Sequence, residues 1–191
     1  MIVTLSGITG TGKSFFKNVI VDELGFKNLA IVTTRKIREN EINGVDKEFV
    51  DDEKFEELVR NNELKVNFEF LGSKYGYRTE KIESDEDQVT EVHYSTIYDV
   101  RKHFKNIFSI YVIPKDIERA KLELKKRNLS KEAEKARLKE IDEHIEEYKT
   151  NKNLREQFDA VLINDYTEKS KKELIDIIKK EILLRKEAVK I

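Results

Sequence analysis

The chain lacks cysteine and tryptophan, and its 191 residues include only one proline and seven glycines. The absence of cysteine excludes a disulfide scaffold, a thiolate metal site and a cysteine nucleophile. No apolar run approaches the roughly 18 residues of a membrane span, and the first residues, MIVTLSG, lack the basic and long apolar regions of a signal peptide. We therefore expect a cytoplasmic protein that does not bind a membrane.

The chain also has no excess of positive or negative charge. The 37 Lys and Arg residues balance 38 Asp and Glu residues, which leaves a formal net charge of −1. A balanced surface produces no global field that would attract nucleic acid or an anionic membrane, so we expect neither as a partner. Hydrophobic residues make up 38% of the chain, enough for the core of one globular domain with a small insertion.

The apolar pattern alternates strands with helices. Short apolar runs predict five strands at 2–5, 29–33, 88–92, 107–113 and 160–163. Helical spacing predicts helices at 13–24, at 95–102, on both sides of a polar break at 128–130, and around 174–183. This order is typical of an α/β fold with a doubly wound parallel sheet.

Residues 35–87 break this rhythm and predict a small α+β insertion. Alternating stretches at 45–50 and 64–70 surround one acidic helix at 52–61, and we expect turns at Gly44, Gly72 and Gly76. The predicted core therefore comprises residues 1–34 and 88–191.

The segment Gly7 to Ser14, GITGTGKS, is the clearest chemical motif. It matches the phosphate-loop pattern G-x-x-x-x-G-K-[ST] between a predicted strand and a predicted helix. Its glycines let backbone N–H groups surround a polyphosphate, Lys13 can reach the β and γ phosphates, and the Ser14 hydroxyl can hold Mg²⁺. A glycine-rich turn without a ligand would not need the Lys-Ser pair. We expect a triphosphate site here.

Arg35 and Arg38 follow the second predicted strand, near the sheet edge where doubly wound folds bind ligands. Two guanidinium groups at this spacing can grip a monophosphate bidentately. The same spacing also fits two surface arginines bridged to Glu39 and Glu41, and the residues alone leave both interpretations open.

Together these stretches resemble the guanylate kinase family over the whole chain. The matching segments are 6–14, 33–50, Tyr75-Gly76 after Gly72, and 163–165. Segment 33–50 is the most specific, because T-T-R-x-x-R-x-x-E-x-x-G-x-D matches without gaps. The resemblance implies a phosphate-loop kinase core that holds ATP, an inserted nucleotide-binding module at 35–87 and a helical lid at about 123–140.

The resemblance also implies in-line phosphoryl transfer from ATP, with Mg²⁺, to a nucleoside monophosphate. The implied catalytic residues are Lys13, Arg127 and Arg137, and Ser14 and Glu91 are implied at the metal. The implied ATP-binding residues are Gly7, Gly10, Thr11, Gly12, Lys13, Ser14, Phe15 and Asn164. The candidate acceptor-binding residues are Thr34, Arg35, Arg38, Lys47, Tyr75, Tyr77, Glu69 and His93.

The positions that read the base depart from the family pattern. Val66 stands where the family has a glutamate, Tyr77 replaces a serine or threonine, and His93 replaces a carboxylate. Without carboxylate partners, guanine loses hydrogen bonds worth roughly 1 to 3 kcal/mol each. GMP or dGMP remains the default acceptor, with an expected loss of base selectivity.

A bulge in the strand at 64–70 offers one way to restore a base contact. A one-residue slip exchanges the two faces of a strand, so a bulge could bring Glu69 or Asn67 to the base. Glu91 stands where an aspartate near the metal is usual, and Lys47 replaces a phosphate-binding tyrosine but remains a donor.

Two other functions stay open. A kinase of the same fold could phosphorylate another nucleotide or a ribose bisphosphate, which would explain the altered base positions. A non-catalytic guanylate-kinase-like binding module is the second alternative, although the complete Gly12-Lys13-Ser14 argues against it. Nucleotides are the expected partners, and the sequence leaves a homodimer open.

Overall fold

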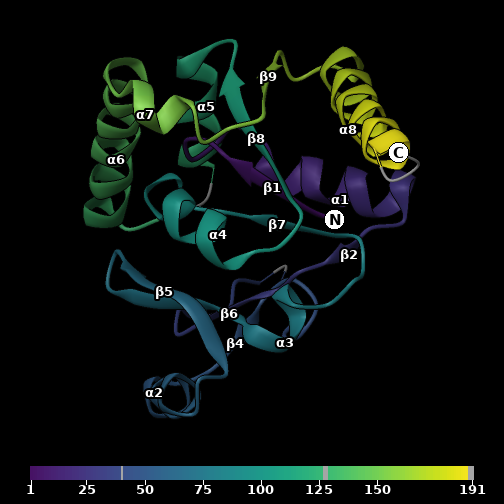
Figure 1. Cartoon of the computed structure of the whole chain (residues 1–191). Coiled ribbons are helices and arrows are strands. Elements are labelled where there is room, and N and C mark those ends of the chain that lie inside the picture. Colours follow the sequence, from purple (N-terminus) through teal and green to yellow (C-terminus); the bar gives the residue numbers. More distant parts are fainter. Residues whose placement is uncertain (40, 127–128, 189–191) are drawn as a thin grey trace. The chain divides into compact units, whose positions relative to one another are not determined.

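The computed structural model describes residues 1–39, 41–126 and 129–188 (Figure 1). These residues divide into two compact units. The first unit comprises Met1–Thr4 and Gly25–Phe108, and the second comprises Leu5–Leu24 and the described residues from Ser109 onward. Hydrogen-bonded strands form a five-stranded sheet in the order β2-β7-β1-β8-β9 and a four-stranded sheet in the order β4-β3-β6-β5. Strand β1 is Ile2–Ser6.

The first unit contains the whole four-stranded sheet. Its strands are β3 (Ile31–Thr33), β4 (Glu48–Phe49), β5 (Leu64–Phe70) and β6 (Ser73–Arg78), and its other strands are β2 (Lys27–Asn28) and β7 (Gln88–Glu91). Its helical segments are α2 (Asp52–Arg60), α3 (Thr79–Ile82), η1 (Tyr94–Thr96) and α4 (Ile97–His103). Helix α2 packs on the sheet through a buried cluster of Val32, Phe55, Leu58 and Leu64.

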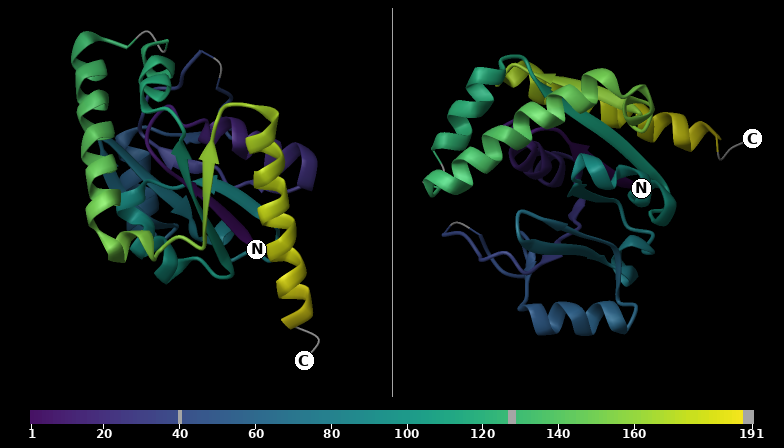
Figure 2. Two further views of the ribbon diagram at one scale, coloured as in Figure 1. Left: turned by 90° about the horizontal axis from the view of Figure 1, so that it is seen from above. Right: turned by 90° about the vertical axis from the view of Figure 1, so that its left-hand side faces the viewer.

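The second unit surrounds the phosphate loop. Its elements are α1 (Lys13–Leu24), α5 (Ile117–Lys125), α6 (Lys131–Thr150), α7 (Lys152–Arg155), β9 (Ala160–Asn164) and α8 (Glu168–Ala188), together with most of β8 (Ile107–Pro114). Strands β8 and β9 are parallel, with Val112 opposite Leu162. Helices α6 and α8 lie on either side of these strands (Figure 2). The side chains of Asp116 and Ser130 cap α5 and α6, which explains where these helices begin.

The predicted α/β fold with a parallel sheet is confirmed, but one predicted strand is wrong. The run 29–33 does not form a single core strand. Lys27 and Asn28 pair in parallel with β7, whereas Ile31 to Thr33 pair antiparallel with β6 in the other sheet. A β-rich run predicts extended backbone without choosing its partner. Arg35 and Arg38 therefore follow a strand of the four-stranded sheet.

The hairpin of β5 and β6 also differs from expectation. Its turn is Leu71-Gly72, where φ is 48° and 71°, between the paired residues Phe70 and Ser73. Positive φ at both central residues is typical of the two-residue turn that matches strand twist. Gly76, expected at a turn, lies inside β6. Strand β4 covers only Glu48–Phe49 of the stretch predicted at 45–50.

Strand β5 contains a bulge between Lys65 and Phe68, and Val66 has a φ of 54°. After the bulge, Phe68 pairs with Tyr75 and Glu69 pairs with Lys74. Directly paired residues share a face, so Phe68 lies on the Tyr75 face and Glu69 lies on the opposite one. The bulge therefore moves Glu69 away from Tyr75, contrary to the expectation that it would restore a base-reading carboxylate.

Lys74 identifies which face carries Glu69. The Lys74 ammonium lies 2.6 Å from a Glu56 carboxylate oxygen and 3.2 Å from one of Asp52, and both acidic residues belong to α2. The face with Glu69 and Lys74 is thus the α2 face. In the described part of the chain, no helix is long and apolar enough to cross a membrane.

Tyr77 is a core residue. Its side chain is completely buried, its hydroxyl donates to the Glu91 carbonyl at 2.8 Å, and its ring meets Phe104 edge-on at 5.0 Å. Burial raises the pKa of the Tyr77 hydroxyl well above its ordinary value. These contacts give Tyr77 a packing role and leave no surface for a nucleotide base.

We predict that Tyr77→Phe lowers the free energy of unfolding by about 1 to 2 kcal/mol, because it removes a buried hydrogen bond. Urea unfolding measures this change. Tyr98→Phe, at a tyrosine that is 43% exposed, is the matched control and should change stability little. Equal stability of Tyr77→Phe and the wild type would show that the Glu91 bond contributes nothing.

Candidate active site

The phosphate loop has a shape that only glycine permits at two positions. Gly7 and Gly10 have φ values of 143° and 89°. A Cβ atom at Gly7 would lie 2.3 Å from the Val112 carbonyl oxygen, and one at Gly10 would lie 2.2 Å from that of Ala120. Backbone atoms cannot yield to such contacts, so both glycines are needed for the loop to pack against β8 and α5.

Side chains from the segment after β9 hold the loop. Asn164 is 3% exposed, and its amide donates to the Thr11 carbonyl at 2.8 Å and accepts from the Tyr166 N–H at 2.7 Å. The Tyr166 hydroxyl donates to the Gly10 carbonyl at 3.1 Å. Thr11 itself is buried, with its hydroxyl on the Ile8 carbonyl at 3.1 Å. Asn164, expected beside ATP, thus has both amide atoms bonded to protein backbone.

Lys13 begins α1 and folds back over the loop. Its ammonium donates to the carbonyls of Gly7 at 2.7 Å and Ile8 at 2.8 Å. Ser14 and Phe15 are exposed on the first turn of the helix. A helix N-terminus with free N–H groups and a lysine beside it favours an anion, because both the dipole and the ammonium are positive there.

The residues around Ser14 fit Mg²⁺ only in the arrangement that is usual when the ion binds together with a nucleotide. Within the described residues, no group of three or more histidine, cysteine, aspartate or glutamate side chains could hold a metal ion. Mg²⁺ commonly takes one or two protein oxygens, with phosphate and water as the other ligands. An exposed hydroxyl at the end of a phosphate loop suits that arrangement.

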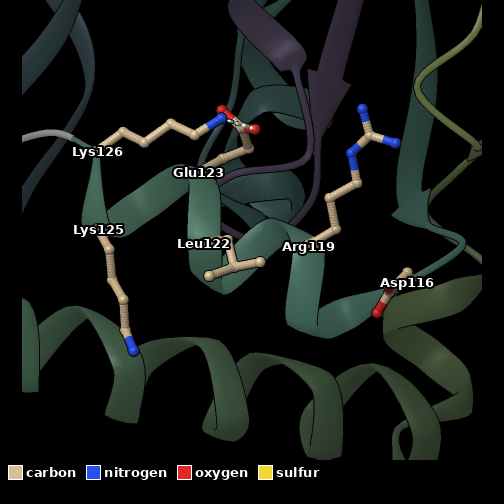
Figure 3. A pocket seen from close by; sticks show the side chains of 6 residues that line it. All are labelled: Asp116, Arg119, Leu122, Glu123, Lys125 and Lys126. Carbon is tan, nitrogen blue, oxygen red and sulfur yellow. Dashed lines mark hydrogen bonds and ion pairs between the residues drawn. The ribbon is translucent and has the colours of Figure 1, made fainter.

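A hollow of about 640 Å³ lies on α5 (Figure 3). The residues that line it are Asp116, Arg119, Leu122, Glu123, Lys125 and Lys126. The Arg119 guanidinium stacks over the Tyr166 ring at 4.4 Å, which links this face of α5 to the residue that bonds Gly10. Lys126 pairs with Glu123. Of the two lid arginines, Arg137 lies on α6, and Arg127 falls outside the described residues.

The first unit carries the arginines expected to bind the acceptor. The Arg35 guanidinium donates to both carboxylate oxygens of Glu41 at 2.7 and 2.8 Å, and stacks over Phe49 at 5.3 Å. The Arg38 N–H donates to the same carboxylate at 2.9 Å, and its guanidinium lies 3.9 Å away. Glu41 thus brings two guanidinium groups together at one point.

The charge state of Glu41 reflects these contacts. Burial would raise its pKa, but the Arg35 hydrogen bond, the Arg38 N–H and the two guanidinium charges together lower it below the ordinary value. Glu41 is therefore an anion at neutral pH. It bonds one guanidinium nitrogen of Arg35 and the backbone N–H of Arg38, which agrees with the interpretation of an ion-paired arginine, whereas phosphate binding by the pair stays a prediction.

Other candidate acceptor residues lie on the neighbouring strands. Tyr75 is 9% exposed and stacks on Phe68 at 5.1 Å. The Thr34 hydroxyl accepts from the Lys74 N–H at 3.0 Å, which extends the pairing of β3 with β6. Lys47 is half-buried beside β4. Among the described residues, the Tyr75 hydroxyl makes no hydrogen bond.

His93 stands in an aromatic cluster. Its ring lies 4.4 Å from Phe70, 4.7 Å from Tyr94 and 6.2 Å from Phe68. Its Nδ1 faces the Ser95 hydroxyl at 2.7 Å. Glu91 ends β7 two residues earlier. The face with Tyr75 is therefore aromatic, and it carries the side chains of Phe68 and Phe70 rather than that of Glu69.

Sequence reasoning missed several residues of these two groups. Phe68 and Phe70 have the alternate spacing of one strand face. This spacing is visible in the sequence, but only the bulge decides which face it is. Arg119, Tyr166 and Glu140 contact the phosphate loop or its supports. Nothing in their spacing distinguishes them from surface residues.

Comparisons with known proteins agree with this arrangement. The guanylate kinase family model matches residues 1–181. A guanylate kinase from Wolbachia pipientis wMel is 30% identical over 189 residues, which cover 96% of this chain and 91% of that protein. The crystal structure of guanylate kinase from Anaplasma phagocytophilum has a TM-score of 0.69 at 25% identity, covering 95% of this chain and 85% of that one.

Shikimate kinase from Bacteroides thetaiotaomicron matches with a TM-score of 0.52 at 11% identity, covering 95% of this chain and 98% of that one, and this likeness concerns the fold alone. The family match spans nearly the whole sequence and includes the phosphate loop and the two-arginine segment. This chain belongs to the guanylate kinase family and is a nucleoside monophosphate kinase.

Proposed function

We propose that this enzyme transfers the γ-phosphoryl group of ATP to a purine nucleoside monophosphate, by default GMP or dGMP, with Mg²⁺. One observation carries the proposal: Arg35 and Arg38 converge on one anion, Glu41, in a chain that also has a complete phosphate loop. A phosphate monoester can replace the carboxylate, because guanidinium groups bind both bidentately.

Two separate groups of residues would bind the acceptor and ATP. Residues 35–87 would bind the acceptor through Thr34 at their border and through Arg35, Arg38, Lys47 and Tyr75. The core of residues 1–34 and 88–191 would bind ATP through the phosphate loop. Residues 123–140 would act as the lid and contribute Arg137, together with Arg127.

Phosphoryl transfer needs positioning and charge neutralisation more than covalent chemistry. Lys13 would neutralise the transferred group, and the position of its ammonium at the loop, on the carbonyls of Gly7 and Ile8, supports this role. The Ser14 hydroxyl would hold Mg²⁺, which supplies further positive charge at the phosphates when it is bound, and a role of Glu91 near the metal stays a prediction. Backbone N–H groups of the loop would bind further phosphate oxygens.

The aromatic face beside Tyr75 supports weak base selectivity. Phe68, Phe70 and His93 offer ring surface to a base, whereas Glu69 is on the other face of the hairpin. Stacking tolerates any base because each has a flat face, while a carboxylate reads the N–H groups of guanine. A ribose bisphosphate acceptor is the second candidate, since the two arginines bind phosphate and require no base.

We predict that Lys13→Met abolishes transfer and leaves the fold intact, because the ammonium stabilises charge that develops on the transferred phosphoryl group. A coupled ATPase assay with GMP measures kcat, and circular dichroism checks the fold. The control is Lys36→Met, because Lys36 is exposed whereas Lys17 is buried. Retention of more than a tenth of kcat, a loss under about 1.4 kcal/mol, would contradict the role of Lys13.

We predict that Arg35→Ala and Arg38→Ala raise the KM for the acceptor at least about tenfold and leave the KM for ATP nearly unchanged. A guanidinium paired with a phosphate contributes on the order of 1.5 to 3 kcal/mol. Arg60→Ala, on helix α2, is the control. If calorimetry shows that both variants bind GMP normally but bind ATP more weakly, residues 35–87 do not bind the acceptor.

We predict that the ratio of kcat/KM for GMP over AMP lies below roughly 10⁴, the discrimination that a fully hydrogen-bonded site gives. The assay measures kcat/KM of the wild type, of His93→Ala and of the control His103→Ala. Each enzyme is tested with GMP, dGMP, AMP, CMP, UMP and ribose 1,5-bisphosphate. A ratio above 10⁴ that His93→Ala leaves unchanged would show that another residue reads the base. Turnover of the bisphosphate alone would favour the second candidate.

A further inference from the structure

Glu140 is a buried carboxylate beside the phosphate loop that no role described above explains. It lies on α6, and its side chain is 12% exposed. One carboxylate oxygen accepts a hydrogen bond of 3.2 Å from the hydroxyl of Thr9, a residue of the loop. Burial raises the pKa of Glu140 above its ordinary value, and the positive charges of Lys13 and Arg137 and the Thr9 hydrogen bond oppose that rise.

The helix that carries Glu140 is firmly seated beside the loop. Ile141, the next residue, is fully buried in a cluster with Ile8 of the loop and with Ala120 and Leu124 of α5. One turn later, His144 is 1% exposed and its Nε2 lies 3.0 Å from the Tyr111 hydroxyl of β8. Hydrophobic packing and a buried polar contact therefore fix this part of α6, and with it the position of Glu140.

A carboxylate at this place has an electrostatic cost. A buried anion loses hydration, and it repels the phosphates that the loop is built to bind. An apolar residue at position 140 would avoid both costs. The carboxylate instead acts on the groups near it, which include the Thr9 hydroxyl, the Lys13 ammonium, the Arg137 guanidinium and the His144 ring, whose Nδ1 lies 3.9 Å from a carboxylate oxygen.

Arg137 precedes Glu140 by three residues on α6, so the two side chains share one face of the helix. The carboxylate attracts Lys13 from the loop side and Arg137 from its own helix. It also keeps these two like charges from repelling each other before a nucleotide arrives. The negative charge of Glu140 thus substitutes for part of the charge that a polyphosphate later supplies.

We propose that Glu140 is a positioning residue that orients Thr9, Lys13 and Arg137 at the phosphate loop for phosphoryl transfer, at some expense in nucleotide affinity. This inference rests on the proposed transfer from ATP. Glu140 bonds Thr9 of the loop and acts on the two cations through its charge, so its effect on the reacting atoms is indirect.

Glu140→Gln tests this role because it removes the charge and preserves the shape and an acceptor for Thr9. We expect kcat to fall at least tenfold, which corresponds to about 1.4 kcal/mol. We expect ADP to bind equally tightly or more tightly by calorimetry, since a repulsive charge is lost. A residue with only a structural role would weaken ADP binding and lower the melting temperature together with kcat.

Two further variants complete the test. Glu146→Gln, at an exposed glutamate of the same helix, should match the wild type in all three measurements. Thr9→Val retains the charge of Glu140 and removes the hydrogen bond, so we expect a smaller fall in kcat and unchanged ADP affinity. Near wild-type kcat in Glu140→Gln would overturn the inference, and so would weaker ADP binding.

The measurements separate this inference from the proposed acceptor. If the wild type phosphorylates no nucleoside monophosphate, the proposed acceptor is wrong. ADP affinity of Glu140→Gln then still decides the role of Glu140, because the loss of a repulsive charge predicts unchanged or tighter binding, whatever the acceptor is. ATP hydrolysis without acceptor supplies the corresponding rate comparison.

Discussion

The close approach of the phosphate loop to two backbone carbonyls is the constraint on which the second unit depends. Gly7 passes the Val112 carbonyl of β8 and Gly10 passes the Ala120 carbonyl of α5, each at a distance that admits no side chain. Asn164 and Tyr166 also hold the loop, because they bond its carbonyls. This packing fixes the loop in front of the N-terminus of α1, a place that favours an anion.

Much of the region around the phosphate loop could be predicted from the sequence because its signals are local. Glycine spacing, the Lys-Ser pair and the adjoining apolar runs lie within 24 residues, and the structure places β1, the loop and α1 where they indicate. The run 29–33 could not be assigned in the same way. Whether an extended segment pairs with β7 or with β6 depends on residues more than 40 positions away.

Predictions about individual side chains depended on details that no pattern reveals. The bulge at Val66 exchanges faces, which moves Glu69 to the α2 side and gives Phe68 and Phe70 to the Tyr75 side. Tyr77 was expected at the acceptor site, and its burial shows a core residue instead. Glu140 is one of many acidic residues on a highly charged helix. Only tertiary contacts distinguish it from those that face solvent, because helical spacing alone does not separate a half-buried stripe from its edges.

The contact of Glu41 with both arginines has a thermodynamic consequence. An anion that binds the Arg35 nitrogen facing Glu41 must displace that carboxylate, so binding there is an exchange of one anion for another. The net affinity is the difference between two similar interactions, which makes it weaker than that of the same guanidinium groups without a partner. In return, the two like charges keep a counterion when no ligand is bound, because Glu41 of the same chain lies beside both guanidinium groups.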